Sequence, residues 1–341
     1  MRNTAEMPAR IERWLADTGR PAKVRSYQLM TGGFSRDMAR VDLTWADGID
    51  EILVMRGDPP AEFATLESDR TAEWNLLASL SRIDTLSVPK ARFFCADTSV
   101  FGTQAMFMEF VPGGSLQASI DAGLDHAETA DRFVDILASV AAIEPAQVPS
   151  LPRPTSWDDY IDGVLARWDR LARGHAEAMP IYRYLVAWMR KRRPKPLPLR
   201  LQHADLQPGN VVAAPDGWRI VDWEFARIGD PREDLGYYSV YSGAVPPALA
   251  QIDLGRFLAR FRERTGFDEE AVNPITFGYF SVLSTVTSVE GLVVASAAMS
   301  RNERKGIPIS FNTHLMTVGA TGFLDAVQGL EAALAAAEAA S

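Results

Sequence analysis

The residues between positions 203 and 224 combine a histidine, an amide and carboxylates at spacings that suit phosphoryl transfer. His203, Asp205 and Asn210 form a His-x-Asp-x-x-x-x-Asn segment, and the apolar run that follows ends in Asp222. A transferring phosphoryl group is highly charged, so a protein mostly positions the reactants and supplies countercharge. Asp205 is predicted to accept the proton of an attacking hydroxyl. Asn210 and Asp222 are predicted to bind Mg²⁺, which prefers oxygen ligands and keeps other positions for water and phosphate.

This segment resembles the catalytic loop of the aminoglycoside phosphotransferase and choline kinase-like family, which usually reads His-Gly-Asp-x-x-x-x-Asn followed by Ile-Asp-Trp-Glu. Here Ala204 replaces the usual Gly, and Gln207 stands where His is common. The resemblance implies an α+β, bilobal protein-kinase-like fold, with a small antiparallel-sheet N-lobe and a larger, mainly helical C-lobe. It also implies ATP as the phosphate donor, with GTP as the alternative, and Mg²⁺ as the metal. Because transfer in that family needs no histidine base, we interpret His203 as a structural member of the loop.

Upstream, alternating apolar and polar residues predict three strands, near 24–30, 37–45 and 51–56. The turn after the first strand contains two consecutive glycines. Glycines allow backbone N–H groups to approach a ligand closely and to surround phosphate oxygens. A simple hairpin turn is the alternative explanation of a Gly-Gly pair. In the context of the motif, the residues predicted to cover the nucleotide phosphates are Gly32, Gly33, Phe34 and Ser35.

The third strand ends in a cation, Arg56, and a helix predicted over about 66–82 carries Glu73. In kinases the basic residue on this strand holds the α- and β-phosphates and pairs with a helix glutamate. The usual residue is Lys, but no Lys occurs between Lys23 and Lys90. Arg stays charged and can bind two oxygens at once, although its reach and geometry differ. A subgroup of the family, similar to kinase domains fused to acyl-CoA dehydrogenases, carries a comparable Gly-Gly-Phe-Ser loop and a strand ending in Arg. Two unconnected surface charges are the alternative.

The run from 104 to 114 resembles a kinase hinge. Adenine recognition there requires a backbone C=O and N–H on an extended segment with apolar walls. By position these are the carbonyl of Glu109 and the amide of Val111, with Met108 at the back of the pocket. An edge strand that ends in a Pro-Gly-Gly turn is the alternative.

The remaining sequence predicts two lobes, an N-lobe over 1–111 and a C-lobe over 112–341. Asp230, followed by Pro and with Glu233 three residues on, marks a helix start, so Asp230 is predicted to be a cap. Asp234 is expected to brace the catalytic loop as its counterpart does in the family. Further helices are predicted over 7–17, 127–143, 157–172, 178–192, 278–298 and 322–340.

Composition fits a globular enzyme: 341 residues, 47% hydrophobic and 23% charged. A net charge of −9 disfavours nucleic acid as a partner. The single cysteine, Cys95, excludes an internal disulfide and is predicted to be a core thiol. The N-terminus lacks the apolar core of a signal peptide and the 278–298 segment is interrupted by polar residues, so we expect no membrane span and a cytoplasmic location. We expect a monomer or homodimer.

The pattern favours an ATP- and Mg²⁺-dependent phosphotransferase acting on a hydroxyl of a small molecule. Glu224, two residues after Asp222, is expected on the same strand face. There it would contact the metal through water or face the substrate, and a plain exposed acid is the alternative. A protein kinase is disfavoured because the helix start at Asp230 leaves no room for an activation segment. A non-catalytic nucleotide-binding scaffold of the pseudokinase type is the alternative from another class, and Arg56 in place of Lys is the feature in its favour. The acceptor is left open among antibiotics, amine alcohols, sugars and hydroxyacyl compounds.

Overall fold

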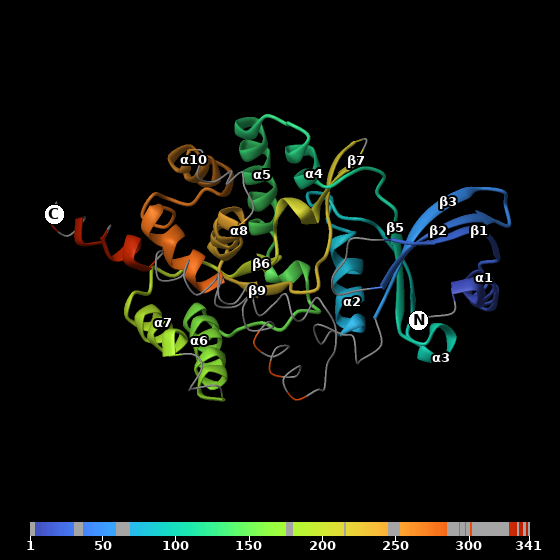
Figure 1. The fold of residues 1–341 in the computed structure, drawn as a ribbon, viewed down its shortest axis with the longest axis horizontal. Helices are drawn as coiled ribbons and strands as arrows, with labels where there is room; N and C mark the ends of the chain where they lie inside the picture. The colour runs from blue at the N-terminus through green and yellow to red at the C-terminus, as the bar shows by residue number, and fades with distance from the viewer. Residues whose placement is uncertain are drawn as a thin grey trace.

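A five-stranded antiparallel sheet forms one end of the molecule, and helices form most of the rest (Figure 1). The computed structural model describes residues 4–30, 37–58, 69–174, 180–214, 216–244 and 253–284, together with 293, 297, 301, 327–332, 334–336 and 339. The sheet has the spatial order β1-β2-β3-β5-β4. All three strands predicted near the N-terminus are confirmed. The strand bounds are β1 (Ala22–Leu29), β2 (Asp37–Trp45), β3 (Asp50–Gly57), β4 (Ala91–Cys95) and β5 (Ala105–Glu109).

The glycine-rich turn between β1 and β2 lies outside the described residues. The pairing of the two strands extends up to its edge, where the N–H of Met30 donates to the carbonyl oxygen of Met38 at 2.9 Å. The structure therefore describes the strands that carry this turn. It does not place the four predicted phosphate-binding residues, Gly32, Gly33, Phe34 and Ser35.

Alternation along β3 gives the sheet two faces with different partners. Leu53 and Met55 pack with helix α1 (Met7–Asp17), which coincides with the helix predicted over 7–17. Arg56 points to the opposite face, where helix α2 (Arg70–Leu80) lies (Figure 1). α2 is shorter than the predicted 66–82 because the Asp69 carboxylate caps it by accepting the N–H of Ala72 at 3.0 Å. The alternation therefore places a cation beside α2.

The larger part of the described chain is helical. The helices predicted over 127–143, 157–172 and 178–192 correspond to α5, α6 and α7, and those over 278–298 and 322–340 are helical where they are described. The other helix bounds are α3 (Thr98–Phe101), α4 (Leu116–Asp121), α5 (His126–Ala141), α6 (Trp157–Gly174), α7 (Pro180–Lys191), α8 (Arg232–Ala244) and α10 (Leu254–Thr265), with 3-10 turns η1 (Thr4–Glu6), η3 (Pro145–Gln147) and η4 (Pro208–Asn210). Asp230 caps α8 as predicted, since its Oδ1 accepts the N–H of Arg232 at 2.9 Å.

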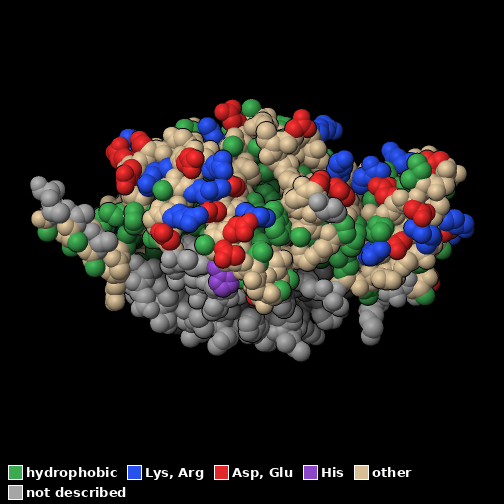
Figure 2. All heavy atoms as spheres, turned by 90° about the horizontal axis from the view of Figure 1, so that it is seen from above, with side chains coloured by type: hydrophobic (Ala, Val, Ile, Leu, Met, Phe, Trp, Pro, Cys, Tyr) green, Lys and Arg blue, Asp and Glu red, His purple; other side chains and the backbone are tan. Residues whose placement is uncertain are grey.

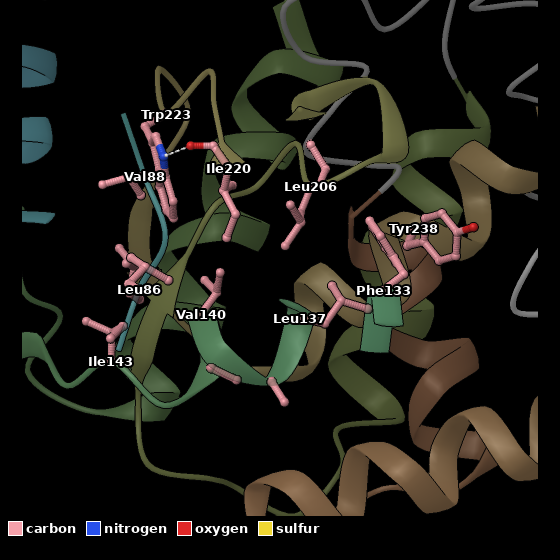
Figure 3. Packing of buried hydrophobic residues seen from close by; sticks show 14 of the residues in the cluster. Leu86, Val88, Phe133, Leu137, Val140, Ile143, Leu206, Ile220, Trp223 and Tyr238 are labelled. Carbon is pink, nitrogen blue, oxygen red and sulfur yellow. Dashed lines mark hydrogen bonds between the residues drawn. The ribbon is translucent and has the colours of Figure 1, made fainter. Parts of the chain in front are cut away.

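Two short two-stranded antiparallel sheets carry the loops in which the predicted catalytic residues lie. They pair β6 (Arg200–Gln202) with β9 (Arg227–Gly229), and β7 (Val211–Ala214) with β8 (Gly217–Ile220). Apolar residues from the same loops point into a core cluster beside α5, and Figure 3 shows this packing for Leu206, Ile220, Trp223, Leu137 and Val140. Full burial of one such side chain contributes about 1.5–3 kcal/mol. The core therefore holds in place the polar residues next to these side chains, such as Asp205 beside Leu206 and Asp222 beside Trp223.

Charged residues of both signs lie side by side on the face shown in Figure 2. Among the ion pairs of the described residues, Arg260 with Asp135 (2.7 Å) and Arg256 with Asp131 fasten α10 to α5. Cys95 is buried, as expected of a core thiol. Within the described ranges, no helix combines the length and apolar character needed to cross a membrane.

Candidate active site

Asp205 lies at the centre of hydrogen bonds that begin within its own loop. Asn210 Nδ2 donates to Asp205 Oδ2 at 2.9 Å and to the Asp205 carbonyl oxygen at 2.8 Å. Gln207 Nε2 donates to Asp205 Oδ1 at 3.3 Å. The tight turn η4, with Pro208 at its start, folds the chain back so that Asn210 reaches Asp205. Both amide hydrogens of Asn210 are directed to Asp205, so its Oδ1 is the atom that is suited to a metal.

The pKa of Asp205 is raised to about 6. Burial is the main cause, and the negative charge of Asp222 acts in the same direction. Hydrogen bonds from Tyr237, Asn210 and Gln207 oppose the shift because they stabilise the carboxylate. A carboxylate with a pKa close to neutrality is suited to take up a proton and release it again.

His203 is completely buried and joins the catalytic loop to the segment that carries Asp222. Its Nε2 lies 2.8 Å from the carbonyl oxygen of Val221, and its Nδ1 accepts the N–H of Asp205 at 3.3 Å. Burial lowers the pKa of His203, so the ring is neutral and carries its proton on Nε2. These contacts agree with the structural interpretation of His203.

Asp234 fixes the same loop from helix α8. Its Oδ2 accepts the N–H of His203 and its Oδ1 accepts the N–H of Ala204, both at 2.7 Å. Ala204 has a φ of 65°, in the left-handed region that favours glycine. This explains why the family usually has Gly at that position. Asp234 therefore braces the loop, as the sequence predicted, and holds Ala204 in a strained conformation.

Asp222 lies after strand β8, which ends at Ile220. The N–H of Val221 donates to the carbonyl oxygen of Asn210 at 2.9 Å, which sets Asp222 beside the catalytic loop. Asp222 itself has a φ of 68°. The prediction that Asp222 ends a strand and that Glu224 shares its strand face is wrong, because this left-handed residue ends the extended conformation. The side chain of Glu224 is only 4% exposed, so it is not a plain exposed acid either.

Arg56 connects three carboxylates. Its Nη2 lies 2.6 Å from Asp222 Oδ1 and 3.1 Å from Glu224 Oε2, and its Nε lies 3.4 Å from Glu73 Oε1. Burial acts to lower the pKa of Arg56, but Asp222, Glu73 and Glu224 outweigh it and the pKa is raised. Burial also raises the pKa of Glu73, against the effect of two arginines. Arg56 and Glu73 are thus not unconnected surface charges. The predicted phosphate ligand is bonded directly to a predicted metal ligand.

Arg70 extends this ion-pair network and was not found by sequence reasoning. It is buried at the start of α2 and contacts both Glu73 and Asp58, the residue after β3. Its spacing of three residues from Glu73 on a helix was the available signal. Arg70 leaves Glu73 with one arginine at each carboxylate oxygen, which fixes the orientation of Glu73 toward Arg56.

The hinge candidates lie at the end of β5, next to the central strand of the sheet. Met108 is buried and pairs with Val54, while the Glu109 carboxylate accepts the N–H of Lys90 at 3.0 Å. Val111 is half-buried in the segment that leaves the sheet. Gly113, two residues on, has a φ of 134°, and a Cβ there would collide with the carbonyl oxygen of Ala213. The glycine therefore permits a close approach of this segment to β7, and the nucleotide roles of the hinge residues stay predictions.

Tyr237 is a contact of Asp205 that sequence reasoning also missed. Its hydroxyl donates to Asp205 Oδ1 from helix α8. Tyr237 follows Asp234 by three residues, so the two share a helix face. That spacing, together with the predicted role of Asp234, could have indicated it.

Comparison with known proteins identifies the family of the chain. The pattern of the family described as "Phosphotransferase enzyme family" matches residues 26–274, which is well over half of the chain. The chain belongs to the phosphotransferase enzyme family. Membership confirms the predicted class of enzyme, a phosphotransferase, and the family resemblance from which it was drawn.

Relatives among curated proteins are acyl-CoA dehydrogenase family members. Member 11 from Homo sapiens is 27% identical over 195 residues, which cover 55% of this chain and 25% of that protein. Member 10 from Mus musculus is 24% identical over 195 residues, covering 55% and 18%. The chain thus spans about a quarter or less of these relatives. They confirm the resemblance to the subgroup linked to acyl-CoA dehydrogenases.

Solved structures confirm the kinase-like α+β fold. A Ralstonia eutropha protein provisionally assigned as an aminoglycoside phosphotransferase has a TM-score of 0.69 at 18% identity, covering 94% of this chain and 98% of its own. A thermostable mutant of aminoglycoside phosphotransferase APH(4)-Ia, in a ternary complex with ADP and hygromycin B, has a TM-score of 0.59 at 14% identity, covering 93% and 98%. Plasmodium vivax ethanolamine kinase has a TM-score of 0.60 at 13% identity, covering 90% and 83%.

Proposed function

We propose that this protein is an ATP- and Mg²⁺-dependent phosphotransferase that moves the γ-phosphate to a hydroxyl group of a small molecule. Family membership supports the reaction class. Proteins of the same fold bind ADP in one complex and GDP in another, which supports a nucleoside triphosphate as donor and keeps GTP as the alternative to ATP. We further propose that residues 1–111 form the nucleotide lobe, with 112–341 supplying the catalytic loop and acceptor site.

The observation that carries the proposal is the contact between Asp205, Asn210 and the Asp222 segment. Asn210 bonds to Asp205 through its side chain and to Val221 through its backbone carbonyl. One residue therefore joins the predicted base to the predicted metal ligand. From the other side, Arg56 reaches Asp222 from the sheet. This arrangement groups a proton acceptor, oxygen ligands and a cation, which are the parts that phosphoryl transfer requires.

In this proposal Asp205 accepts the proton of the acceptor hydroxyl as the hydroxyl oxygen attacks the γ-phosphorus. The bond between the γ-phosphorus and the β,γ-bridging oxygen breaks, and the nucleoside diphosphate leaves with that oxygen. Asn210 keeps the Asp205 carboxylate oriented through the 2.9 Å bond to Oδ2. Glu73, itself held by Arg70, keeps Arg56 beside Asp222. The hinge atoms assigned to adenine are the carbonyl of Glu109 and the amide of Val111, with Met108 behind them.

The residues present fit Mg²⁺. Asn210 Oδ1 and the Asp222 carboxylate are hard oxygen ligands, and the Asp222 side chain is 30% exposed, so it is accessible. Counted as ionised groups, Arg56 and Arg70 face four carboxylates, an excess of two negative charges. Over the described ranges, no cluster of three or more His, Cys, Asp or Glu side chains forms a metal cage. Two protein ligands suit an ion that is shared with nucleotide phosphates, whose charge it neutralises when bound.

The acceptor is proposed only as a small hydroxylated molecule. Two proteins of this fold are named for, or bound to, chemically different compounds, ethanolamine in one case and hygromycin B in the other. Hydroxyacyl compounds, sugars and other antibiotics, which the sequence left open as acceptors, stay in the choice beside them. The scaffold is therefore compatible with several acceptor classes.

A screen of acceptors tests the proposal. Pure protein is incubated with MgATP or MgGTP and a panel of aminoglycosides, amine alcohols, sugars and hydroxyacyl thioesters, and nucleoside diphosphate release is measured against an Asp205→Asn control. We expect at least one class to raise nucleotide turnover in the wild type and not in the control. Binding of nucleotide without transfer to any member of the panel, and without hydrolysis, would instead support a non-catalytic scaffold.

A further inference from the structure

Asp205 Oδ1 and Oδ2 have different surroundings. Oδ1 accepts from the Tyr237 hydroxyl and from Gln207 Nε2 (3.3 Å), whereas Oδ2 accepts from Asn210 Nδ2 (2.9 Å). Each carboxylate oxygen offers about two lone-pair positions. Among the described residues, both positions of Oδ1 are therefore used and one position of Oδ2 remains. An attacking hydroxyl would meet Oδ2.

Tyr237 is held in a fixed position relative to the catalytic loop. It lies on α8 one turn after Asp234, whose carboxylate binds the backbone N–H groups of His203 and Ala204 at 2.7 Å. The helix itself is packed tightly, since a Cβ at Gly236 would collide with the backbone of Phe280. One face of α8 thus fixes both the backbone of the catalytic loop and the side chain of its acid. Such support determines how closely a reacting group keeps its productive geometry.

Gln207 complements Tyr237 from within the loop. In the resembling family a histidine is common at this position, and histidine exchanges its proton near neutral pH. Gln207 is instead an uncharged donor at every pH. Together Tyr237 and Gln207 bind Oδ1 from two different elements, α8 and the loop, so the carboxylate cannot rotate without losing a hydrogen bond.

We infer that Tyr237 is a positioning residue, which holds Asp205 Oδ1 so that Oδ2 receives the proton of the acceptor hydroxyl. This inference rests on the proposed function. It adds a residue outside the His-x-Asp-x-x-x-x-Asn motif to the reaction and assigns the proton to one oxygen. Among the described residues the Tyr237 hydroxyl bonds to Asp205, the proposed base, so its loss should lower kcat and leave nucleotide affinity unchanged.

The test is a double-mutant cycle on Tyr237 and Asp205. Turnover of MgATP is followed with water as the acceptor, by release of inorganic phosphate, for the wild type, Tyr237→Phe, Asp205→Asn and the double variant. Tyr238→Phe is the matched control, because it also removes one phenolic hydroxyl from α8, at the next residue. The ring of Tyr238 packs against Phe133 in the core. A thermal melt of each variant shows that it is folded.

We expect Tyr237→Phe to lower kcat about 10- to 100-fold, which corresponds to a lost hydrogen bond to a charged group, with KM for ATP within about twofold. In the Asp205→Asn background the same change should have little further effect, because the group that it positions is gone. Tyr238→Phe should keep the wild-type kcat. An unchanged kcat in Tyr237→Phe, or losses that multiply in the double variant, would overturn the inference while leaving the proposed function intact. Where water gives no turnover, the same cycle is run with the acceptor found in the panel described above. Absence of Asp205-dependent turnover in the wild type with water and with every member of that panel would overturn the proposed function and this inference with it.

Discussion

Replacing Arg56 by Met should destabilise the protein strongly, because three carboxylates contact this guanidinium. The side chains of Arg56, Glu73 and Glu224 are each 4–5% exposed, so water cannot replace the lost cation. Removing one partner of a buried ion pair costs about 3–5 kcal/mol. Arg70 still pairs with Glu73, and Asp222 is partly exposed, so both carboxylates are compensated in part when Arg56 is lost. We therefore expect a loss at the lower end of this range, about 3 kcal/mol.

Urea unfolding with and without Mg²⁺ measures the effect, with Arg40→Met as the matched control. Arg40 lies on the same sheet face, since it pairs with Val54, but it is 35% exposed and its partner is Asp42 at 2.8 Å. Such a surface pair contributes about 0–1 kcal/mol. Arg56→Lys should fall between Arg56→Met and the wild type, because an ammonium keeps the charge but not the fork that reaches several carboxylates.

Urea unfolding in the presence of Mg²⁺ tests whether this ion-pair network is linked to the metal site. A bound divalent cation offsets the excess of carboxylates, so Mg²⁺ should stabilise Arg56→Met more than it stabilises the wild type. If Arg56→Met unfolds at the same urea concentration as Arg40→Met, the three carboxylates do not depend on Arg56 and the reasoning is refuted. Stabilisation by Mg²⁺ that is equal in all variants would refute the link between this network and the metal site.

Three further predictions follow from single residues. Gly113→Ala should destabilise the protein by about 1–3 kcal/mol in urea unfolding, because its Cβ would collide with Ala213; a stability equal to wild type would show that the segment can move away. Ala204→Gly should leave stability unchanged or raise it by up to about 1 kcal/mol, since glycine relieves the positive φ at a modest entropic cost; a clear loss would contradict this. Phosphate transfer should fall as the pH drops below about 6, because Asp205 then takes up a proton and cannot act as a base; a pH–rate profile that is flat from 8 to 5 would argue against this role.

Much of the fold could be predicted because its signals are local. Helix 7–17 and strand 37–45 match α1 and β2 to the residue, since apolar periodicity defines both. The Pro-Gly turn before Asn210 is a local signal as well: the spacing predicted Asn210 as a metal ligand, and the structure adds that the turn brings its amide against Asp205. In these cases the cause lies within a few residues of its effect.

The remaining features depend on conformations or contacts that the sequence does not reveal. Asp222 has a positive φ that a non-glycine residue rarely adopts, so extending the strand to Glu224 was reasonable and wrong. Arg56 pairs with Asp222 across 166 positions, and no periodicity encodes such a contact. Tyr237 and Arg70 were accessible in principle, since each lies three residues from an acid already singled out on a helix.

The most direct test of the central claim measures nucleotide binding and phosphate transfer side by side in Asp205→Asn and Asp222→Asn. Asp205→Asn keeps the shape of the loop but removes the base, so transfer should fall about 10²–10⁴-fold while MgATP affinity by calorimetry barely changes. Asp222→Asn removes a carboxylate from the metal site, so transfer and Mg²⁺-dependent nucleotide binding should be lost together. Turnover by Asp205→Asn at the wild-type rate would contradict the assignment of the catalytic loop.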